Sequence, residues 1–220
     1  MSTADKWDDG CKEDEVRNEF VIPKLVQLIN EMRPSQVLDI GTGTGYIVRS
    51  VDACVRQKPE WTLIDMDEER IAFAVKEMSQ SVNFKVYTKN FMEDEIQGGP
   101  FDFVLLLFTL LELDLKMELF SKVKQLTSEN GYVVITMPDS LEDVLKSAVK
   151  TPSLLSDFVK GRCVLGKVDK FTEEEYPFKA HRFEYIVQLM LQSSFSLIKM
   201  FSHMNGDNET FMLVFKKMVD

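Results

Sequence analysis

Short apolar runs alternate along the chain with segments in which apolar residues recur at helical spacing. Helical spacing begins near residues 47, 68 and 115, and Asn130-Gly131 is expected to cap the last of these helices. Runs typical of buried strands occupy residues 36–40, 61–64, 101–107 and 132–136, and residues 82, 84 and 86 alternate as in a half-buried strand. This alternation of strands and helices favours βαβ units and a parallel sheet.

The two ends of the chain extend this pattern. An acidic N-terminus precedes an apolar helix at about 20–29, so residues 1–34 are expected to hold N-terminal helices. A last helix at 183–191 leads to strands at 195–201 and 211–215, and the turn at 204–208 between these strands predicts a hairpin.

Residues 139–182 do not fit the alternation. They contain two helical pieces, 141–149 and 154–159, followed by a polar stretch with Gly161, Gly166 and Pro177. We interpret this region as an insertion that forms a lid over the carboxyl edge of the sheet.

Size and charge limit the possible functions. A length of 220 residues suits one domain with a sizeable core, and 45% hydrophobic residues indicate a globular fold. Acids outnumber bases 36 to 26, which gives a formal net charge of −10. Nucleic acids and anionic membranes bind basic surfaces, so this charge disfavours both as partners.

Cysteine usage and the apolar segments bear on the compartment. Cys11, Cys54 and Cys163 have no metal-ligand spacing, which predicts free thiols and a cytoplasmic protein. The charged N-terminus is unlike a signal peptide, and the apolar stretch at 103–111 is too short to cross a membrane.

A glycine-rich turn, Asp39-Ile40-Gly41-Thr42-Gly43-Thr44-Gly45, follows the first predicted strand. Such a turn is where α/β proteins bind nucleotide-like ligands, because glycine accepts positive φ and lets a ligand approach the main chain. The spacing differs from the Gly-x-Gly-x-x-Gly of dinucleotide sites. A carboxylate at Asp39 would repel a pyrophosphate and would suit a ligand that carries positive charge.

The stretch from Val37 to Gly45 resembles the first motif of class I S-adenosylmethionine methyltransferases. That cofactor carries a sulfonium and an ammonium group, which agrees with an acid at Asp39. The resemblance covers residues 35–137 by motif and 183–220 by topology. It implies one domain over residues 1–220 with an α/β, Rossmann-like, doubly wound seven-stranded sheet, mostly parallel and ending in an antiparallel hairpin. It also implies that the cofactor is S-adenosylmethionine, that the product is S-adenosylhomocysteine and that no metal takes part. By the resemblance, the cofactor binds at Asp39, Gly41, Thr42, Gly43 and Gly45.

Asp65 ends the second predicted strand, 24 residues after Gly41. A carboxylate about 20 residues after such a turn can accept two hydrogen bonds from ribose hydroxyls. By the resemblance, Asp65 holds the cofactor ribose and Met66 packs on the adenine. Asp67 competes for the ribose role, but its place just before a helix suits it better as a cap.

Asn90 and Phe91 follow the third predicted strand. Many family members bind the adenine amino group with an acid here, and the side-chain carbonyl of Asn90 can accept the same bond. Phe91 would then border the adenine edge. An asparagine in a turn also often bonds its own backbone in an Asx turn, so both roles stay open for Asn90.

The fourth predicted strand runs into Leu107-Phe108-Thr109-Leu110. The Asn/Asp-Pro-Pro-Tyr motif that holds a flat amine in DNA and protein N-methyltransferases is absent from this position. By the resemblance, Phe108 faces the methionine arm of the cofactor, and Asp102 at the strand start is a structural residue. No acid cluster accompanies this motif, so a magnesium-dependent mechanism is not expected.

Acceptor residues are expected in the N-terminal segment and the lid. Arg17 could pair with a carboxylate of cofactor or acceptor, or could be an ordinary surface arginine. Tyr176, His181 and Arg182 belong to a segment similar to the one before the closing helix of small-molecule methyltransferases. His181 and Glu112 are the candidate general bases, although a lone histidine is often structural.

The lid itself would select the acceptor through Phe158, Phe171, Tyr176 and Phe178. Residues 158–182 hold six bases and four acids. This excess of positive charge either favours an anionic acceptor or belongs to a solvated loop of mixed charge.

The sequence thus predicts a methyltransferase that moves a methyl group from S-adenosylmethionine to an O, N or C atom of a small-molecule acceptor, as a monomer or homodimer. Three alternatives stay open. They are an RNA- or protein-directed methyltransferase, a non-catalytic regulatory subunit of the same fold, and an NAD-dependent oxidoreductase, which the charge of Asp39 opposes.

Overall fold

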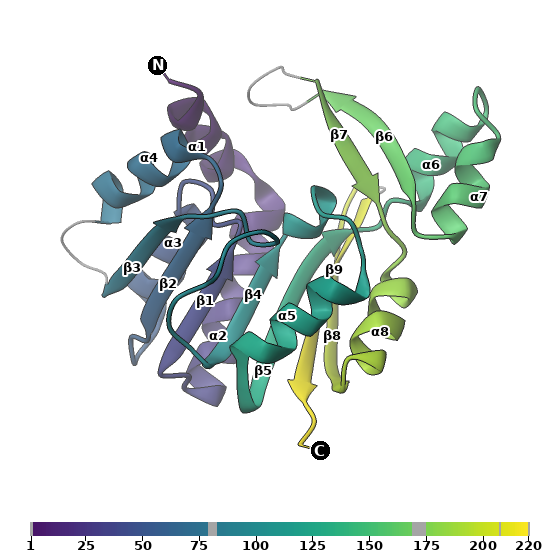
Figure 1. The fold of residues 1–220 in the computed structure, drawn as a ribbon. Helices are drawn as coiled ribbons and strands as arrows, with labels where there is room; N and C mark the ends of the chain where they lie inside the picture. Colours follow the sequence, from purple (N-terminus) through teal and green to yellow (C-terminus); the bar gives the residue numbers. More distant parts are fainter. Residues whose placement is uncertain (1, 79–82, 169–174, 207, 220) are drawn as a thin grey trace.

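A seven-stranded sheet forms the centre of the protein in its computed structural model, which describes residues 2–78, 83–168, 175–206 and 208–219 (Figure 1). The strands lie in the order β3-β2-β1-β4-β5-β9-β8. Their bounds are β1 Gln36–Ile40, β2 Glu60–Asp65, β3 Phe84–Thr88, β4 Phe101–Leu107, β5 Thr127–Pro138, β8 Phe195–Asn205 and β9 Asn208–Lys217. Val82, which the sequence assigns to the third strand, lies outside the described residues.

The pairing of these strands confirms the predicted fold class. Strands β1 to β5 pair with one another in parallel, β9 runs antiparallel to β5, and β8 and β9 form the C-terminal hairpin. The strand order reverses between β1 and β4. In open α/β sheets, ligands bind at such a reversal, outside the carboxyl ends of the strands.

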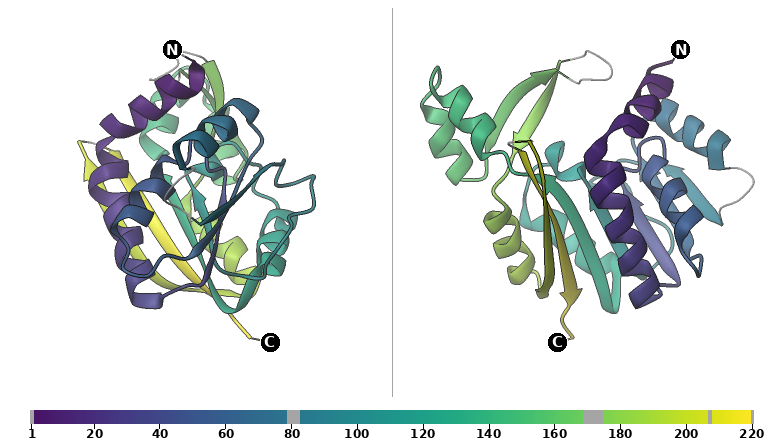
Figure 2. Two further views of the ribbon diagram at one scale, coloured as in Figure 1. Left: turned by 90° about the vertical axis from the view of Figure 1, so that its left-hand side faces the viewer. Right: turned by 180° about the vertical axis from the view of Figure 1, so that it is seen from behind.

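Helices cover both faces of the sheet, and each face has its own hydrophobic core. One face carries α2 Ile22–Met32, α3 Tyr46–Cys54 and α4 Glu68–Met78, and the other carries α5 Met117–Leu126 and α8 Phe183–Gln192. The right-hand view of Figure 2 shows the first face, with α2 nearest the viewer. Successive strand residues point to opposite faces, so Val37 and Leu38 enter different cores. Burial on both faces explains why these strands read as continuous apolar runs.

The N-terminal segment lies across the carboxyl edge of the sheet. It consists of α1 Thr3–Glu13 and a π-helical turn, η1 Val16–Val21, that leads into α2. Asp8 of α1 is buried and forms an ion pair with Arg49 of α3, with Nη2 and Oδ1 2.7 Å apart. Of the helices in the described ranges, none is long and apolar enough to cross a membrane. Cys11, Cys54 and Cys163 are free thiols, as predicted.

The segment 139–182 is here called the lid, and its described residues, 139–168 and 175–182, form a lobe above the carboxyl edge of the sheet (Figure 1). The lobe contains α6 Leu141–Ala148, α7 Ser153–Val159 and an antiparallel hairpin of β6 Cys163–Val168 and β7 Glu175–Ala180. The polar stretch after α7 thus contains two strands, which were not predicted from the sequence. Alternate strand residues of the hairpin, among them Leu165 and Phe178, point into a small core that their polar neighbours conceal in the sequence.

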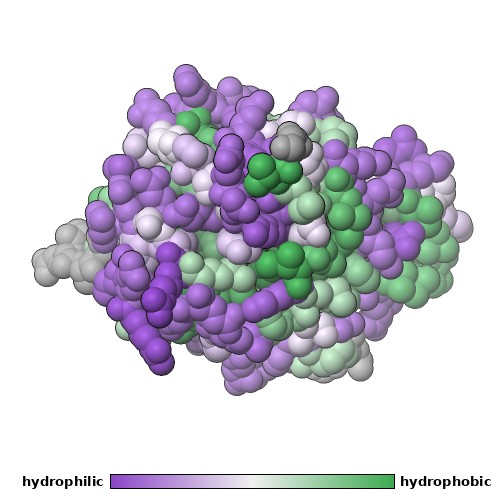
Figure 3. All heavy atoms as spheres, turned by 90° about the horizontal axis from the view of Figure 1, so that it is seen from below, coloured by the Kyte–Doolittle hydropathy of each residue, from purple (hydrophilic) through white to green (hydrophobic). Residues whose placement is uncertain are grey.

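This small core changes the interpretation of the lid aromatics. Phe158 and Phe178 pack in it with Val144, so they fill the lid instead of facing an acceptor. Phe171 and the side chain of Tyr176 lie outside the described residues. On the outside of the lobe Val149 and Val159 stay exposed, and Figure 3 shows hydrophobic surface on this side of the molecule.

Two details of the sheet concern predicted roles. The prediction that Asn130-Gly131 caps α5 is wrong, because α5 ends at Leu126 and the pair lies inside β5. Asn130 has φ 62°, which asparagine tolerates better than most residues, and the β4–β5 register shifts nearby. Asp102 accepts hydrogen bonds from the backbone N–H groups of Ser35 (2.8 Å) and Gln36 (3.1 Å), which confirms its structural role.

Candidate functional site

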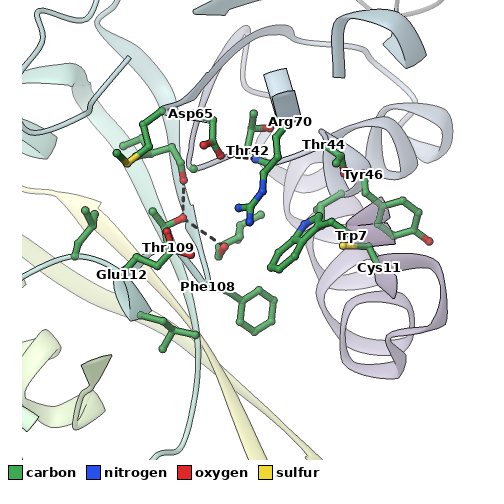
Figure 4. A pocket seen from close by; sticks show the side chains of 18 of the residues that line it. Trp7, Cys11, Thr42, Thr44, Tyr46, Asp65, Arg70, Phe108, Thr109 and Glu112 are labelled. Atoms are coloured by element: carbon green, nitrogen blue, oxygen red, sulfur yellow. Dashed lines mark hydrogen bonds between the residues drawn. The ribbon is translucent and has the colours of Figure 1, made fainter. Parts of the chain in front are cut away.

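A cavity of about 850 Å³ opens at the carboxyl ends of β1, β2 and β4, where the strand order reverses. The glycine turn after β1 forms its floor, and the loop after β4 forms one wall. Figure 4 shows Trp7 and Arg70 on one side of this space and Phe108, Thr109 and Glu112 on the other. The lid contributes Asp143, Lys167 and Pro177 to the lining. The cavity therefore brings together the lid and the predicted cofactor residues except Asp39 and Gly45, which do not line it.

The glycine turn has the backbone that its sequence predicts. Gly41, Gly43 and Gly45 have φ values of 72°, 56° and 71°, in the region that favours glycine. A Cβ on Gly41 would lie 2.7 Å from the Oγ1 atom of Thr109, and a Cβ on Gly43 would lie 3.5 Å from Nε1 of Trp7. A side chain at Gly41 would therefore clash with Thr109, whereas one at Gly43 would make only an ordinary contact with Trp7. Gly41, Thr42 and Gly43 line the cavity.

Asp39 lies beneath the turn and not on the cavity surface, with 3% of its surface exposed. Burial raises the pKa of this carboxyl to about 7, and the charge of Asp65 adds to the upward shift. The nearby Thr42 hydroxyl lowers the pKa and so opposes the shift. Asp39 is thus partly ionised near neutral pH, and a positive charge placed above the turn would favour its ionised form.

Asp65 ends β2 beside the turn and lines the cavity. Its Oδ2 accepts a hydrogen bond from the backbone N–H of Gly43 at 2.7 Å, and its Oδ1 accepts one from Asp67 at 3.0 Å. Each carboxylate oxygen can accept a further bond. Asp67 accepts bonds from the N–H groups of Glu69 and Arg70, which confirms that Asp67 caps α4.

The adenine candidates also line the cavity. Met66 is 69% exposed at the rim, whereas Phe91 is buried. The side-chain carbonyl of Asn90 accepts a hydrogen bond from the backbone N–H of Met92 at 3.0 Å, so the Asx turn is present. The remaining lone pair of this oxygen and the amide nitrogen stay available to a ligand.

The loop after β4 includes a short 3-10 helix, η2 Thr109–Leu111. Phe108 has φ 62°, an uncommon conformation for a non-glycine residue, and its N–H donates to the carbonyl of Thr136. The Thr109 hydroxyl donates to the carbonyl of Ile40 at 2.6 Å, next to the glycine turn. Glu112 lies on the same wall of the cavity.

The N-terminal helices supply residues that the sequence motifs do not reveal, among them Trp7, Cys11 and Asp14. Arg17 lines the cavity, pairs with Asp14 at 2.8 Å and places its guanidinium carbon 4.8 Å from the centre of the Phe108 ring. Arg70 stacks on Trp7 at 4.3 Å. In this part of the site the sequence predicted Arg17 but not Trp7, Cys11 or Asp14.

His181 and Arg182 do not reach the cavity lining. His181 is 2% exposed, and its Nε2–H donates to the carbonyl of Leu110 at 2.9 Å. Burial lowers the pKa of His181, and the carbonyls of Leu110 and Leu113 oppose that shift. Arg182 pairs with Glu184 at 3.4 Å.

Two lysines of the lid have acidic partners. Lys167 pairs with Asp143 within the lid, and Lys179 pairs with Asp114 at 2.7 Å. These pairs reduce the positive charge of residues 158–182 that could act on an acceptor, and they favour the loop of mixed charge.

The chain matches a family described as methyltransferase domain over residues 33–191 and belongs to that family. Its fold is similar to that of an S-adenosylmethionine-dependent methyltransferase from Methanosarcina mazei (20% identity, TM-score 0.66, covering 84% of this chain and 93% of that one). It is also similar to magnesium protoporphyrin IX methyltransferase from Synechocystis PCC 6803 with bound S-adenosylhomocysteine (13% identity, TM-score 0.69, covering 97% of this chain and 93% of that one). A third similar structure is N-methyltransferase NodS from Bradyrhizobium japonicum WM9 (10% identity, TM-score 0.63, covering 93% of this chain and 98% of that one). A comparison with curated proteins finds no match. The prediction of a class I S-adenosylmethionine-dependent methyltransferase is confirmed.

Proposed function

We propose that this methyltransferase acts on an O, N or C atom of a small-molecule acceptor that binds between the glycine turn and the lid. The observation that carries the proposal is a cavity of about 850 Å³ that is lined both by the predicted cofactor residues, except Asp39 and Gly45, and by residues of the lid. This volume is typical of small-molecule sites, which span roughly 300–1,000 Å³. The net charge of −10 argues against an RNA acceptor.

The residues around the glycine turn fit S-adenosylmethionine. Gly41 and Gly43 present the main chain of the turn to the cavity, and the free lone pairs of Asp65 suit ribose hydroxyls. Met66, Asn90 and Phe91 would enclose the adenine, with Asn90 bonding its edge. Arg17 faces the cavity beside Phe108 and would hold the cofactor carboxylate.

When bound, S-adenosylmethionine supplies an electrophilic methyl group. The chain then has to orient the acceptor and exclude water, which can account for much of the rate enhancement in such a reaction. Leu111 and Leu113 give the wall after β4 an apolar surface for this purpose. Glu112 lies on that wall and would take a proton from an O or N nucleophile. We assign no proton-transfer role to His181, because it does not reach the cavity.

Two measurements test this proposal. Calorimetry should show that the full chain binds S-adenosylhomocysteine and not NADH. A screen of small molecules should then find an acceptor that converts S-adenosylmethionine to S-adenosylhomocysteine. Absence of binding would favour a non-catalytic subunit, and binding of tRNA that weakens steeply with salt would favour an RNA acceptor.

We further propose that the enzyme works in the cytoplasm as a monomer or homodimer. The three free cysteines support a reducing compartment. Light scattering coupled to size exclusion decides between the two oligomeric states, and a larger assembly would contradict both.

A further inference from the structure

The loop at residues 108–113 forms a wall shared by the cofactor and acceptor parts of the cavity. Phe108, Thr109, Leu111, Glu112 and Leu113 all line the cavity. Leu110 is the exception, because its side chain is fully buried in the core beneath the loop. The backbone of Leu110 therefore determines where its five neighbours stand.

Two hydrogen bonds fix the start of this loop to the sheet. The N–H of Phe108 donates to the carbonyl of Thr136 at 2.9 Å, and the Thr109 hydroxyl donates to the carbonyl of Ile40 at 2.6 Å. The first bond ties the loop to β5 and the second ties it to the end of β1. Both lie before Leu110, so the later part of the loop needs support from another element.

That support comes from the chain segment that leaves the lid. His181 follows β7 directly, and its Nε2–H donates to the carbonyl of Leu110 at 2.9 Å. Two residues earlier, Lys179 pairs with Asp114 at 2.7 Å, just past the loop. The exit of the lid thus contacts the loop through the buried bond from His181 and contacts the residue just past the loop through Lys179.

The chemistry of this contact assigns the tautomer of His181. A carbonyl oxygen only accepts hydrogen bonds, so the proton must sit on Nε2. A ring nitrogen that donates to the main chain cannot at the same time take a proton from a substrate. The bond also lies in a buried setting, where losing a hydrogen-bond partner leaves an unsatisfied carbonyl.

We infer that His181 is a positioning residue, which fixes the Leu110 carbonyl and thereby holds the loop at 108–113 where the cavity needs it. Its effect on ligand binding rests on the proposed function, whereas its effect on the loop does not. The same bond connects the lid to the wall that Phe108 shares with the cofactor.

Amide hydrogen exchange of the full chain tests this inference, with His181→Ala, His181→Gln and His203→Ala compared with wild type. Without ligand, His181→Ala should speed exchange in the 108–113 peptide roughly tenfold, the size expected for one lost buried hydrogen bond. His181→Gln should restore much of the protection, because its amide N–H can donate to the same carbonyl. His203, the second of two histidines, stacks on Phe20 and serves as the matched control that leaves this peptide unchanged.

Calorimetry with S-adenosylhomocysteine adds a functional readout. The dissociation constant should rise several-fold in His181→Ala, return toward wild type in His181→Gln and stay constant in His203→Ala. Unchanged exchange at 108–113 in His181→Ala would overturn the inference. So would equal damage in the Ala and Gln variants, or faster exchange spread evenly over the chain, since both indicate a loss of bulk packing. If wild type does not bind S-adenosylhomocysteine, the proposed function fails, and the ligand-free exchange still decides the role of His181.

Discussion

At the scale of single residues, Asp65 joins the glycine turn to the start of α4, because its carboxylate accepts hydrogen bonds from Gly43 and Asp67. Replacing Asp65 with Asn removes the charge that suits ribose hydroxyls. We expect the dissociation constant for S-adenosylhomocysteine to rise roughly 10- to 100-fold, because hydrogen bonds to a charged group contribute about 1.5–3 kcal/mol. Calorimetry measures this change.

Asp67→Asn provides the matched control for this prediction. Asparagine caps a helix about as well as aspartate, so α4 and the ligand affinity should both stay near wild type. Equal losses of affinity in the two variants would show that the ribose contact is not specific to Asp65.

Gly41 offers a second test at this scale, because φ 72° and contact with Thr109 both oppose a side chain there. We expect Gly41→Ala to lower the free energy of unfolding by about 2–4 kcal/mol, from left-handed strain and overpacking together. Gly206 has a similar φ of 60° and open space around it. In Gly206→Ala strain alone should therefore lower the free energy of unfolding, by about 1–2 kcal/mol. Urea unfolding of both variants measures the difference, and equal costs would mean that Thr109 moves aside.

The turn and the acids at the ends of β1 and β2 could be predicted from sequence because local backbone demands fix them. Gly41 needs positive φ, and Asp67 caps the helix that follows it. Trp7 and Arg70 could not be predicted in the same way. Their places in the cavity depend on how α1 packs against α4, and no local pattern encodes that packing.

At the scale of elements, the position of α1 depends on a buried charge. Asp8 is 2% exposed and pairs with Arg49 of α3 at 2.7 Å. Removing one partner of a buried pair leaves the other uncompensated, which is strongly destabilising. We expect Asp8→Ala to release α1 from the cavity, to shift the fluorescence of Trp7 to longer wavelength and to weaken S-adenosylhomocysteine binding.

The chain contains its own controls for this release. Trp61 is fully buried under α3, so its emission should not change, and Trp7→Phe identifies the signal from α1. Asp9→Ala removes only an exposed pair with Lys12, which contributes less than about 1 kcal/mol. An unchanged Trp7 signal in Asp8→Ala would show that other contacts suffice to dock α1.

The sheet could be predicted element by element, whereas the lid could not. Parallel strands buried on both faces appear as continuous apolar runs, so β1, β2 and β4 stand out in the sequence. The hairpin of β6 and β7 buries one face of only a few residues, among them Leu165 and Phe178, and charged neighbours mask the pattern. The same limitation applies to His181, because only the fold shows that it contacts Leu110.

At the scale of the whole molecule, the burial of Asp39 makes the stability of the fold depend on pH. In the described part of the chain, Asp39 is one of a few acids with a buried side chain, together with Asp8, Asp14, Asp52 and Asp65. The pKa of Asp39 is raised from an ordinary value of 3.8 to about 7. Burial is the main cause and the charge of Asp65 adds to the shift, whereas the Thr42 hydroxyl opposes it.

Because the folded state binds this proton more tightly than the unfolded state, Asp39 favours folding fully below pH 3.8. That contribution is lost as pH rises, at up to about 1.4 kcal/mol per pH unit, until Asp39 ionises in the folded protein near pH 7. Asp39→Asn carries no such proton. Its free energy of unfolding relative to wild type should therefore rise between pH 5 and pH 7 and level off above pH 7. Urea unfolding of both proteins at several pH values measures this difference, and a constant difference would show that Asp39 titrates normally beneath the glycine turn.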